Sequence, residues 1–263
     1  MQSTPTDGPL VVAIDSSTTA TKAIVVDAAG NVLALGKRDI ALLSPEQGFG
    51  EHDPRQWWTS TRAAIAEPLA GLTPAEKERV AALGITHQRE SFAPFTADGT
   101  PLRNGILWLD IRAADQAQRY GTPEIHALSG RPADVTPGLY KMAWLKEHEP
   151  ESLRAADKVT TVSAYIAFCL TGSWVDSAAC ADSLSLSNIR TLDYDEGLLQ
   201  IAGVRRDQMA ELVKPGQVLG TLKRAVADEW GIAEIPVIAG CGDGQAAGVG
   251  AAAVSPDVAY LNM

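Results

Sequence analysis

The chain has 263 residues, of which 46% are hydrophobic and 21% charged, and its formal net charge is −10. This length allows one or two domains with a buried core, and no apolar stretch is long enough for a membrane-spanning helix. The negative charge argues against unaided binding to nucleic acid or to an anionic membrane, because their phosphates would be repelled.

The cysteines and the first residues bear on the cellular compartment. Cys169, Cys180 and Cys241 are odd in number and widely spaced, and the four histidines are scattered, so neither a disulfide framework nor a zinc site is expected. The opening MQSTPTDGPL is polar and lacks the basic start and apolar run of a secretory signal. We therefore expect a cytoplasmic protein.

The first part of the chain is typical of an antiparallel meander. Residues 1–8 indicate a flexible leader rich in Ser, Thr, Pro and Gly. The segments LVVAID (10–15), TKAIVVD (21–27) and VLALG (32–36) alternate with a polar SSTTA stretch and an AAGN turn, which predicts three strands.

A helix is predicted next. Asp53 can cap free backbone N–H groups, and Pro54 at the first helical position loses no hydrogen bond. The helix is expected to continue until Pro68 and Gly71 end it, with Trp57 and Trp58 packed in the core.

The remaining elements alternate between strands and helices. Val80–Thr86 indicates a strand, and Ser91–Trp108 a hairpin around the turn at Ala97–Gly99. Amphipathic spacing predicts helices at Gly138–Glu147, Ser163–Leu170, Glu196–Ala202, Arg206–Leu212 and Arg224–Trp230. IPVIAGCGDG (235–244) is a short strand broken by glycines, and VAYLNM (258–263) is typical of the start of a last strand. We expect one α/β domain over residues 9–263, with a helical insertion between about residues 113 and 232.

The segment after the first predicted strand has the composition of an anion site. Asp15 ends the strand and consecutive hydroxyl residues follow, whose side chains and backbone N–H groups can surround phosphate oxygens. Lys22 would add positive charge, and Asp15 could hold a hydrated Mg²⁺. A polar hairpin turn explains the same residues equally well. The frame of a Walker loop is absent.

Asp243 lies among glycines at the end of the late apolar strand. Glycines let the backbone approach a ligand closely, and α/β proteins bind their ligands at such strand ends. A carboxylate there can accept a proton from a substrate hydroxyl. It can also cap a helix over residues 244–253, and the two roles are compatible.

Two further segments offer groups suited to a carbohydrate. Arg89 and Glu90 follow one strand and Trp108 follows another, which supplies donors, acceptors and a flat apolar face for a polyhydroxy compound. Surface ion pairing and an anchored aromatic side chain are the alternative interpretation.

Taken together, these segments resemble the FGGY carbohydrate kinases. The segments DSSTTATKA, GFGEHDPRQWW, GITHQRES, ILWLDIRA and VIAGCGDGQAAGVGA occur in the family's order and spacing, from about Leu10 to Met263. The resemblance implies an actin-like, ribonuclease-H-like α/β fold with a mixed sheet flanked by helices. It also implies transfer of the ATP γ-phosphoryl group to a hydroxyl of a polyol or ketose sugar, with ATP and Mg²⁺ as cofactors.

The resemblance assigns roles to individual residues. Asp243 matches the catalytic base, and Asp15, Thr18, Thr19 and Lys22 match the first phosphate loop, with Asp15 near the metal. The residues expected at the substrate are Arg89, Glu90, Trp108, Asp110 and Gln245.

Departures from the family pattern affect the choice of substrate. The QRE form with Glu90 is that of glycerol kinases, whereas Thr136 stands where those enzymes have a tyrosine, and the W-x-D-x-R form of residues 108–112 looks more like the sugar-type members. Ser17 also replaces a glycine common in the phosphate loop. The pocket therefore has features of both groups.

The resemblance implies a second actin-like domain of similar size, which we expect to be absent from this chain. We therefore expect the chain to be the N-terminal, sugar-binding domain, with little turnover by itself; a homodimer is one expectation for its assembly. Two alternatives stay open: another actin-like phosphohydrolase, which has no need for Arg89, Glu90 or Trp108, and a non-catalytic nucleotide-dependent assembly protein, which would lack a base at Asp243.

Overall fold

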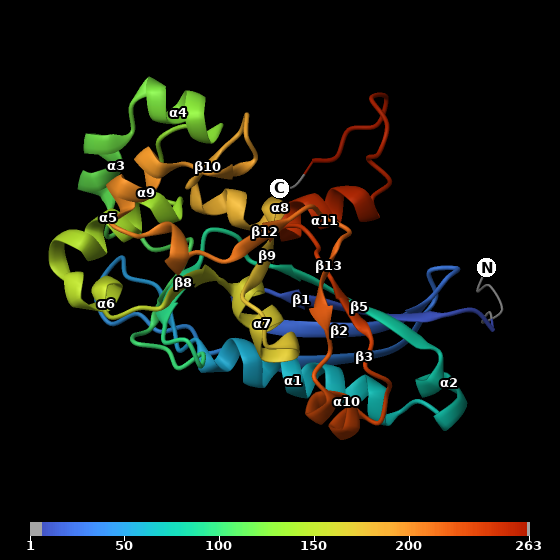
Figure 1. Cartoon of the computed structure of the whole chain (residues 1–263). Coiled ribbons are helices and arrows are strands. Elements are labelled where there is room, and N and C mark those ends of the chain that lie inside the picture. Colours follow the sequence, from blue (N-terminus) through green and yellow to red (C-terminus); the bar gives the residue numbers. More distant parts are fainter. Residues whose placement is uncertain (1–6, 262–263) are drawn as a thin grey trace.

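A computed structural model of the chain describes residues 7–261. Its main element is a six-stranded sheet in the order β13-β14-β5-β1-β2-β3 (Figure 1). The strands are β1 (Leu10–Ser16), β2 (Ala20–Asp27), β3 (Val32–Asp39), β5 (Val80–His87), β13 (Val218–Thr221) and β14 (Pro236–Ile238). β1, β5 and β14 run parallel, and the other pairings are antiparallel. The predicted mixed sheet and its opening meander are confirmed.

Three helices cover one face of this sheet. They are α1 (Arg55–Ala70), α7 (Val162–Thr171) and α10 (Arg224–Trp230). Alternate residues of β1, including Leu10, Val12 and Ile14, are buried against them, whereas Val11 on the opposite face is 36% exposed. This period-two burial is what the alternating pleat of a strand requires. Figure 1 shows α1 lying along the sheet.

The helix predicted after Pro54 is α1. The helix begins one residue later than predicted, with Pro54 at the N-cap position, and the Asp53 carboxylate accepts a hydrogen bond from the Arg55 N–H at 3.0 Å. The helix includes Pro68 and ends at Ala70, before Gly71. Trp57 is fully buried against the rings of Phe95 and Tyr165, and Trp58 packs partly buried on the same core.

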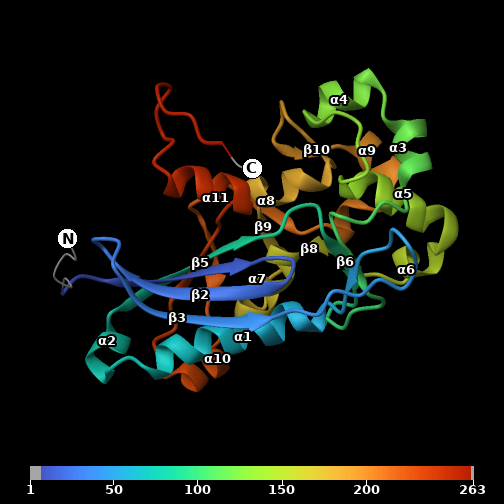
Figure 2. The same ribbon diagram turned by 180° about the vertical axis from the view of Figure 1, so that it is seen from behind.

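A second sheet joins the main sheet to a cluster of helices. Its order is β4-β7-β6-β8, formed by β4 (Glu51–His52), β7 (Gly105–Ile106), β6 (Phe92–Phe95) and β8 (Lys158–Thr161), and β6 and β7 are the predicted hairpin. The helices are α3 (Ala114–Tyr120), α4 (Pro123–Ser129), α5 (Gly138–His148), α6 (Pro150–Arg154), α8 (Ala178–Ala181) and α9 (Glu196–Ala202). They enclose a second apolar core and lie beyond one end of the main sheet (Figure 2).

Short elements complete the described chain. They are α2 (Pro74–Glu78), β9 (Val175–Ser177), β10 (Ser187–Asn188), β11 (Asp193–Tyr194), β12 (Glu211–Val213), α11 (Asp243–Gly250) and the 3₁₀ turns η1 (Asp182–Leu184) and η2 (Arg206–Gln208). No helix in residues 7–261 is both long and apolar enough to cross a bilayer.

Several sequence predictions are wrong. The helix expected over residues 206–212 is only a 3₁₀ turn at Arg206–Gln208, and β12 then begins at Glu211 and pairs with β9, so strand pairing replaces the expected helix. The helical insertion is interrupted, because β8, α7 and β9 return the chain to the sheets. Residues 258–261 do not form a strand; residues 262–263 and residues 1–6 of the predicted leader lie outside the described residues.

Candidate active site

The carboxyl ends of three parallel strands meet at one edge of the main sheet. Ser16 of β1 is in register with His87 of β5, and His87 forms a parallel bridge with Gly242. The residues that follow, which include Thr18, Arg89 and Asp243, therefore leave the sheet at the same edge. This is the place where α/β sheets bind ligands.

The first of these segments is a tight turn after β1. The Ser17 N–H donates to the Ala20 carbonyl at 3.0 Å, and the Ser17 hydroxyl donates to Asp15 Oδ2 at 2.8 Å. Asp15 Oδ1 is buried and has no hydrogen-bond partner among the described residues. Lys22 lies directly opposite Asp15 in the β1–β2 register, and Thr19 is exposed. Ser17 does not have a positive φ, so it is accommodated without backbone strain.

Arg89 and Glu90 are held by residues of the helical cluster. Arg89 Nη2 lies 2.9 and 2.8 Å from the two carboxylate oxygens of Asp182. Glu90 has a φ of +63°, its N–H donates to Ser183 Oγ at 3.1 Å, and its Oε1 accepts from Arg131 Nη1 at 2.5 Å. Burial raises the pKa of the Asp182 carboxyl above its usual value, and the neighbouring Arg89 offsets only part of this increase. A left-handed glutamate costs about 1 kcal/mol and persists only where its surroundings hold it.

Trp108 is held at its backbone and at its side chain. Its N–H donates to Ser91 Oγ at 3.1 Å, and its carbonyl accepts from the buried Lys141 ammonium at 2.9 Å. Its indole N–H donates to Thr18 Oγ1 at 2.8 Å. Trp108 is therefore in direct contact with the turn after β1, which is the predicted phosphate loop and is called the phosphate-type turn below. The residue is 41% exposed, which leaves ring surface open to a ligand.

Asp110 is held inside the protein, and its role as a substrate ligand stays a prediction. Its side chain is fully buried. Its carboxylate accepts from the Gly50 N–H at 2.7 Å and from Arg112, which also pairs with the buried Glu51. These contacts tie the loop that carries Trp108 to Gly50 and Arg112 inside the protein.

Asp243 is the first residue of α11, and its side chain is exposed. Oδ1 accepts from the Gly244 N–H at 2.8 Å, and the N-cap position is Gly242, so the alternative of a capping aspartate for residues 244–253 is wrong. A Cβ at Gly242 would lie 2.4 Å from Arg89 Cδ and 2.6 Å from Gln245 Oε1. Arg89 and Gln245 therefore border the same glycine, and only a residue without a side chain fits between them.

Gln88 is one contributor that the sequence analysis did not select. It is 1% exposed, and its amide contacts Ser17, Thr18 and Ser91. Asp182 and Arg131 were also missed, because their sequence neighbours carry no motif and only the fold brings them to Arg89 and Glu90.

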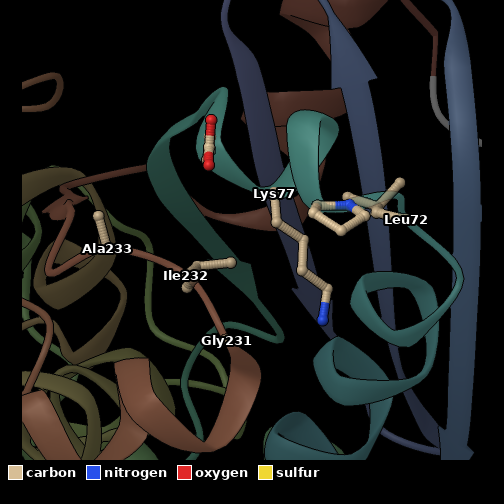
Figure 3. A pocket seen from close by; sticks show the side chains of 7 residues that line it. Leu72, Lys77, Gly231, Ile232 and Ala233 are labelled. Carbon is tan, nitrogen blue, oxygen red and sulfur yellow. The ribbon is translucent and has the colours of Figure 1, made fainter.

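Two cavities lie outside the sheet edge. One of about 850 Å³ is lined by Asp182, by the α8 residues Ala178 and Ala179 and by apolar residues around β12, so it adjoins the partner of Arg89. Another of about 420 Å³, shown in Figure 3, is lined by Leu72, Lys77 and Ile232 among others. It lies beside α2, which directly precedes β5, and is therefore at the amino end of the parallel strands, away from Asp243.

Comparison with known proteins identifies relatives over nearly the whole chain. The chain is 32% identical over 245 residues to the glycerol kinase of Thermococcus gammatolerans, covering 90% of this chain and 48% of the relative. It is 30% identical over 259 residues to the xylulose kinase of Escherichia coli K12, covering 97% of this chain and 52% of the relative. The chain thus spans about half the length of these relatives.

Solved structures and a family model agree with the sequence relatives. The xylulose kinase from Rhodospirillum rubrum superposes with a TM-score of 0.88 at 26% identity, over 94% of this chain and 51% of that one. The model of the N-terminal domain of the FGGY family of carbohydrate kinases matches residues 10–250. Fold, motif order and relatives agree that the chain belongs to the FGGY family of carbohydrate kinases and corresponds to its N-terminal domain.

Proposed function

We propose that this chain is the sugar-binding domain of a kinase that transfers the γ-phosphoryl group of ATP to a hydroxyl of a polyol or ketose, with Asp243 as general base. One observation carries the proposal. Asp15 lies at the carboxyl end of β1, Arg89 follows β5, and Asp243 follows Gly242, which bridges His87 of β5. All three therefore lie at the same edge of the sheet, which supports a single site for metal, substrate and general base.

The substrate would lie between Trp108 and the strand ends. The exposed ring of Trp108 offers a face for carbon-bound hydrogens, as is common in carbohydrate recognition. Arg89 and Glu90 would donate to and accept from neighbouring hydroxyls, and their ion-pair partners fix their orientation. Gln245, which borders the same glycine as Arg89, would add an amide contact.

The phosphates would lie over the turn after β1. Thr18 and Thr19 would donate hydroxyl hydrogen bonds, and Lys22 would add positive charge. The buried Asp15 Oδ1 without a partner suits the ligands of a hydrated magnesium ion. No group of three or more His, Cys, Asp or Glu side chains in residues 7–261 could hold a metal directly, so water would complete the shell. When bound, Mg²⁺ offsets the charge of the phosphate oxygens.

Asp243 would act on the attacking hydroxyl. Its exposed carboxylate at the sheet edge can accept the hydroxyl proton as the oxygen attacks the phosphorus atom. The rest of the rate enhancement would come from holding the acceptor oxygen in line with the phosphoryl group.

The substrate class follows from the pocket and from the names of the relatives. Glu90 matches the glycerol-kinase form, whereas Thr136 and the W-x-D-x-R segment favour a sugar, and the relatives include both glycerol and xylulose kinases. We propose a neutral polyol or ketose. Because the relatives are about twice as long, we also propose that the 263-residue chain alone turns over little and that the remaining half supplies the adenine site.

The direct test is ADP release by the complete gene product that contains this chain, with Mg²⁺-ATP and a panel of polyols and ketoses. The proposal expects one compound to raise turnover well above the rate without sugar. Equal ATP hydrolysis with and without every compound would refute it and favour a phosphohydrolase or an assembly ATPase.

A further inference from the structure

Three hydrogen bonds connect Trp108 to its surroundings, and one of them crosses to the phosphate-type turn. The Ser91 hydroxyl and the Lys141 ammonium hold the Trp108 backbone at 3.1 and 2.9 Å. Only the indole N–H reaches Thr18, at 2.8 Å. Under the proposed function, the face of the Trp108 ring would contact the substrate. The N–H edge of the same ring contacts the turn that would bind the phosphates.

Gln88 holds the other side of this contact. Its Oε1 accepts from the Thr18 hydroxyl at 3.4 Å and from the Ser91 hydroxyl at 3.0 Å, and its Nε2 donates to the Ser17 carbonyl at 3.2 Å. Since Gln88 is 1% exposed, its amide is fixed within the protein. The same side chain therefore contacts the turn and the serine that supports Trp108.

The Thr18 hydroxyl can donate only one hydrogen bond at a time. A hydroxyl has one proton, and here Thr18 donates it to Gln88 Oε1 over a long distance of 3.4 Å. To donate to a phosphate oxygen, Thr18 must turn that proton outward, which breaks only the weak 3.4 Å bond while Ser91 still satisfies Gln88. The Trp108 N–H can remain on the Thr18 oxygen, and this donor makes the hydroxyl a stronger donor itself.

We propose that the indole N–H of Trp108 positions the Thr18 hydroxyl for the phosphates and so couples sugar binding to nucleotide binding. This inference rests on the proposed function. A sugar on the exposed ring face fixes the indole orientation, and the fixed indole fixes Thr18. Because coupling between two sites is reciprocal, bound nucleotide increases sugar affinity by the same factor.

The test measures a ratio of dissociation constants by calorimetry on the complete gene product. The probes are the β,γ-imido analogue of ATP with Mg²⁺, and D-xylulose or glycerol. The coupling factor is the Kd of the analogue without sugar divided by its Kd at saturating sugar, and we expect about fivefold or more in the unmodified protein. Being a ratio, it is insensitive to a uniform loss of affinity for either ligand.

Paired variants isolate the contact. Trp108→Phe keeps a ring but removes the N–H, and Thr18→Val keeps the shape but removes the hydroxyl; each should reduce the factor to within about twofold of one, and the double variant should lose nothing more. Thr18→Ser should retain the coupling. Trp58→Phe is the matched control and should behave as the unmodified protein, because no described residue hydrogen-bonds its indole.

The outcomes separate this inference from the proposed function. If sugar and analogue both bind but the factor is one, or if Trp108→Phe keeps the original factor, the coupling proposal is wrong and the kinase proposal stands. If the unmodified protein binds neither probe sugar nor the analogue, both proposals are overturned.

Discussion

Arg89 and Asp182, 93 residues apart in sequence, form an ion pair in which Arg89 Nη2 contacts both carboxylate oxygens, at 2.9 and 2.8 Å. The pair joins the end of β5 to the helical cluster at the η1 turn. The aliphatic part of the same arginine packs against Gly242, one residue before the proposed base.

Replacing Asp182 tests whether this pair positions Arg89 for the substrate. Asp182→Asn should raise the sugar KM about fivefold, corresponding to about 1 kcal/mol, with a smaller change in kcat. Asp228→Asn, which removes an exposed carboxylate 3.6 Å from Arg224, is the control and should leave KM unchanged. An unchanged KM in Asp182→Asn would show that Arg89 needs no partner.

The carboxylate of Asp110 should prove structural. Asp110→Asn leaves the buried Arg112 with a weaker partner, so the free energy of unfolding should fall by about 3 kcal/mol, while the sugar KM of the folded protein stays near its original value. Asp115→Asn, at an exposed position nearby, should change neither quantity. A raised KM at unchanged stability would instead restore Asp110 as a ligand. Urea titration and steady-state kinetics measure the two quantities.

Lys141 should be needed for both stability and substrate affinity. Its fully buried ammonium donates to the carbonyls of Leu107, Trp108 and Thr136 at 2.6, 2.9 and 2.9 Å. Lys141→Met leaves the Trp108 and Thr136 carbonyls without this donor, and the Leu107 carbonyl keeps only the Asp110 N–H at 3.1 Å. We therefore expect a loss of about 3 kcal/mol in unfolding free energy and a raised sugar KM.

The matched control is on the same helix. Lys146 is exposed and donates to a single carbonyl, that of Gln200, so Lys146→Met should cost less than about 0.5 kcal/mol. Equal effects of the two substitutions would contradict the account of Lys141.

Stability should fall as the pH is lowered from 7 to 4. Burial lowers the pKa of both His52 and His87 to about 4. The unfolded chain therefore takes up these protons near pH 6.5 while the folded chain does not, which costs up to about 3 kcal/mol for each histidine by pH 4. Asp176 acts oppositely, because burial raises its pKa to about 6 and the folded chain gains its proton first.

His87→Leu isolates one of these contributions. It should reduce the loss of unfolding free energy between pH 7 and pH 4 by about 3 kcal/mol, measured by denaturant titration at each pH. His126→Leu, at an exposed position, should leave the pH dependence as it was. If His87→Leu kept the same pH dependence, His87 would have to take up its proton over the same pH range in the folded chain as in the unfolded chain, which would contradict this explanation.

Local sequence patterns predicted the strands, the first helix and the residues at the strand ends. The apolar run of residues 10–15 forms a strand, and the Asp53-Pro54 pair precedes a helix. In both cases a few neighbouring residues determine the local structure. The prediction of a helix at residues 206–212 was wrong because it used only the local spacing of apolar residues. The pairing of β12 with β9, some 36 residues earlier in the chain, determines the structure there instead.

The site was predictable only where each residue follows a strand. Asp15, Arg89 and Asp243 were selected as candidates in this way. Asp182, Arg131 and Lys141 reach the candidate site through packing of the helical cluster and carry no local signal. The burial of Asp110 could not be predicted, because the sequence gives its type but not its surroundings, and Glu51, which shares Arg112 with it, lies 59 residues away.

The central claim is that Asp243 accepts the proton of the attacking hydroxyl, and sugar-dependent ADP release by the Asp243→Asn variant of the complete gene product tests it most directly. The account predicts that kcat falls about 10²–10⁴-fold while the melting temperature stays unchanged, because the replaced side chain is exposed. Asp257→Asn, at another exposed position, should keep full activity. A kcat of Asp243→Asn within tenfold of the unmodified protein would contradict the account.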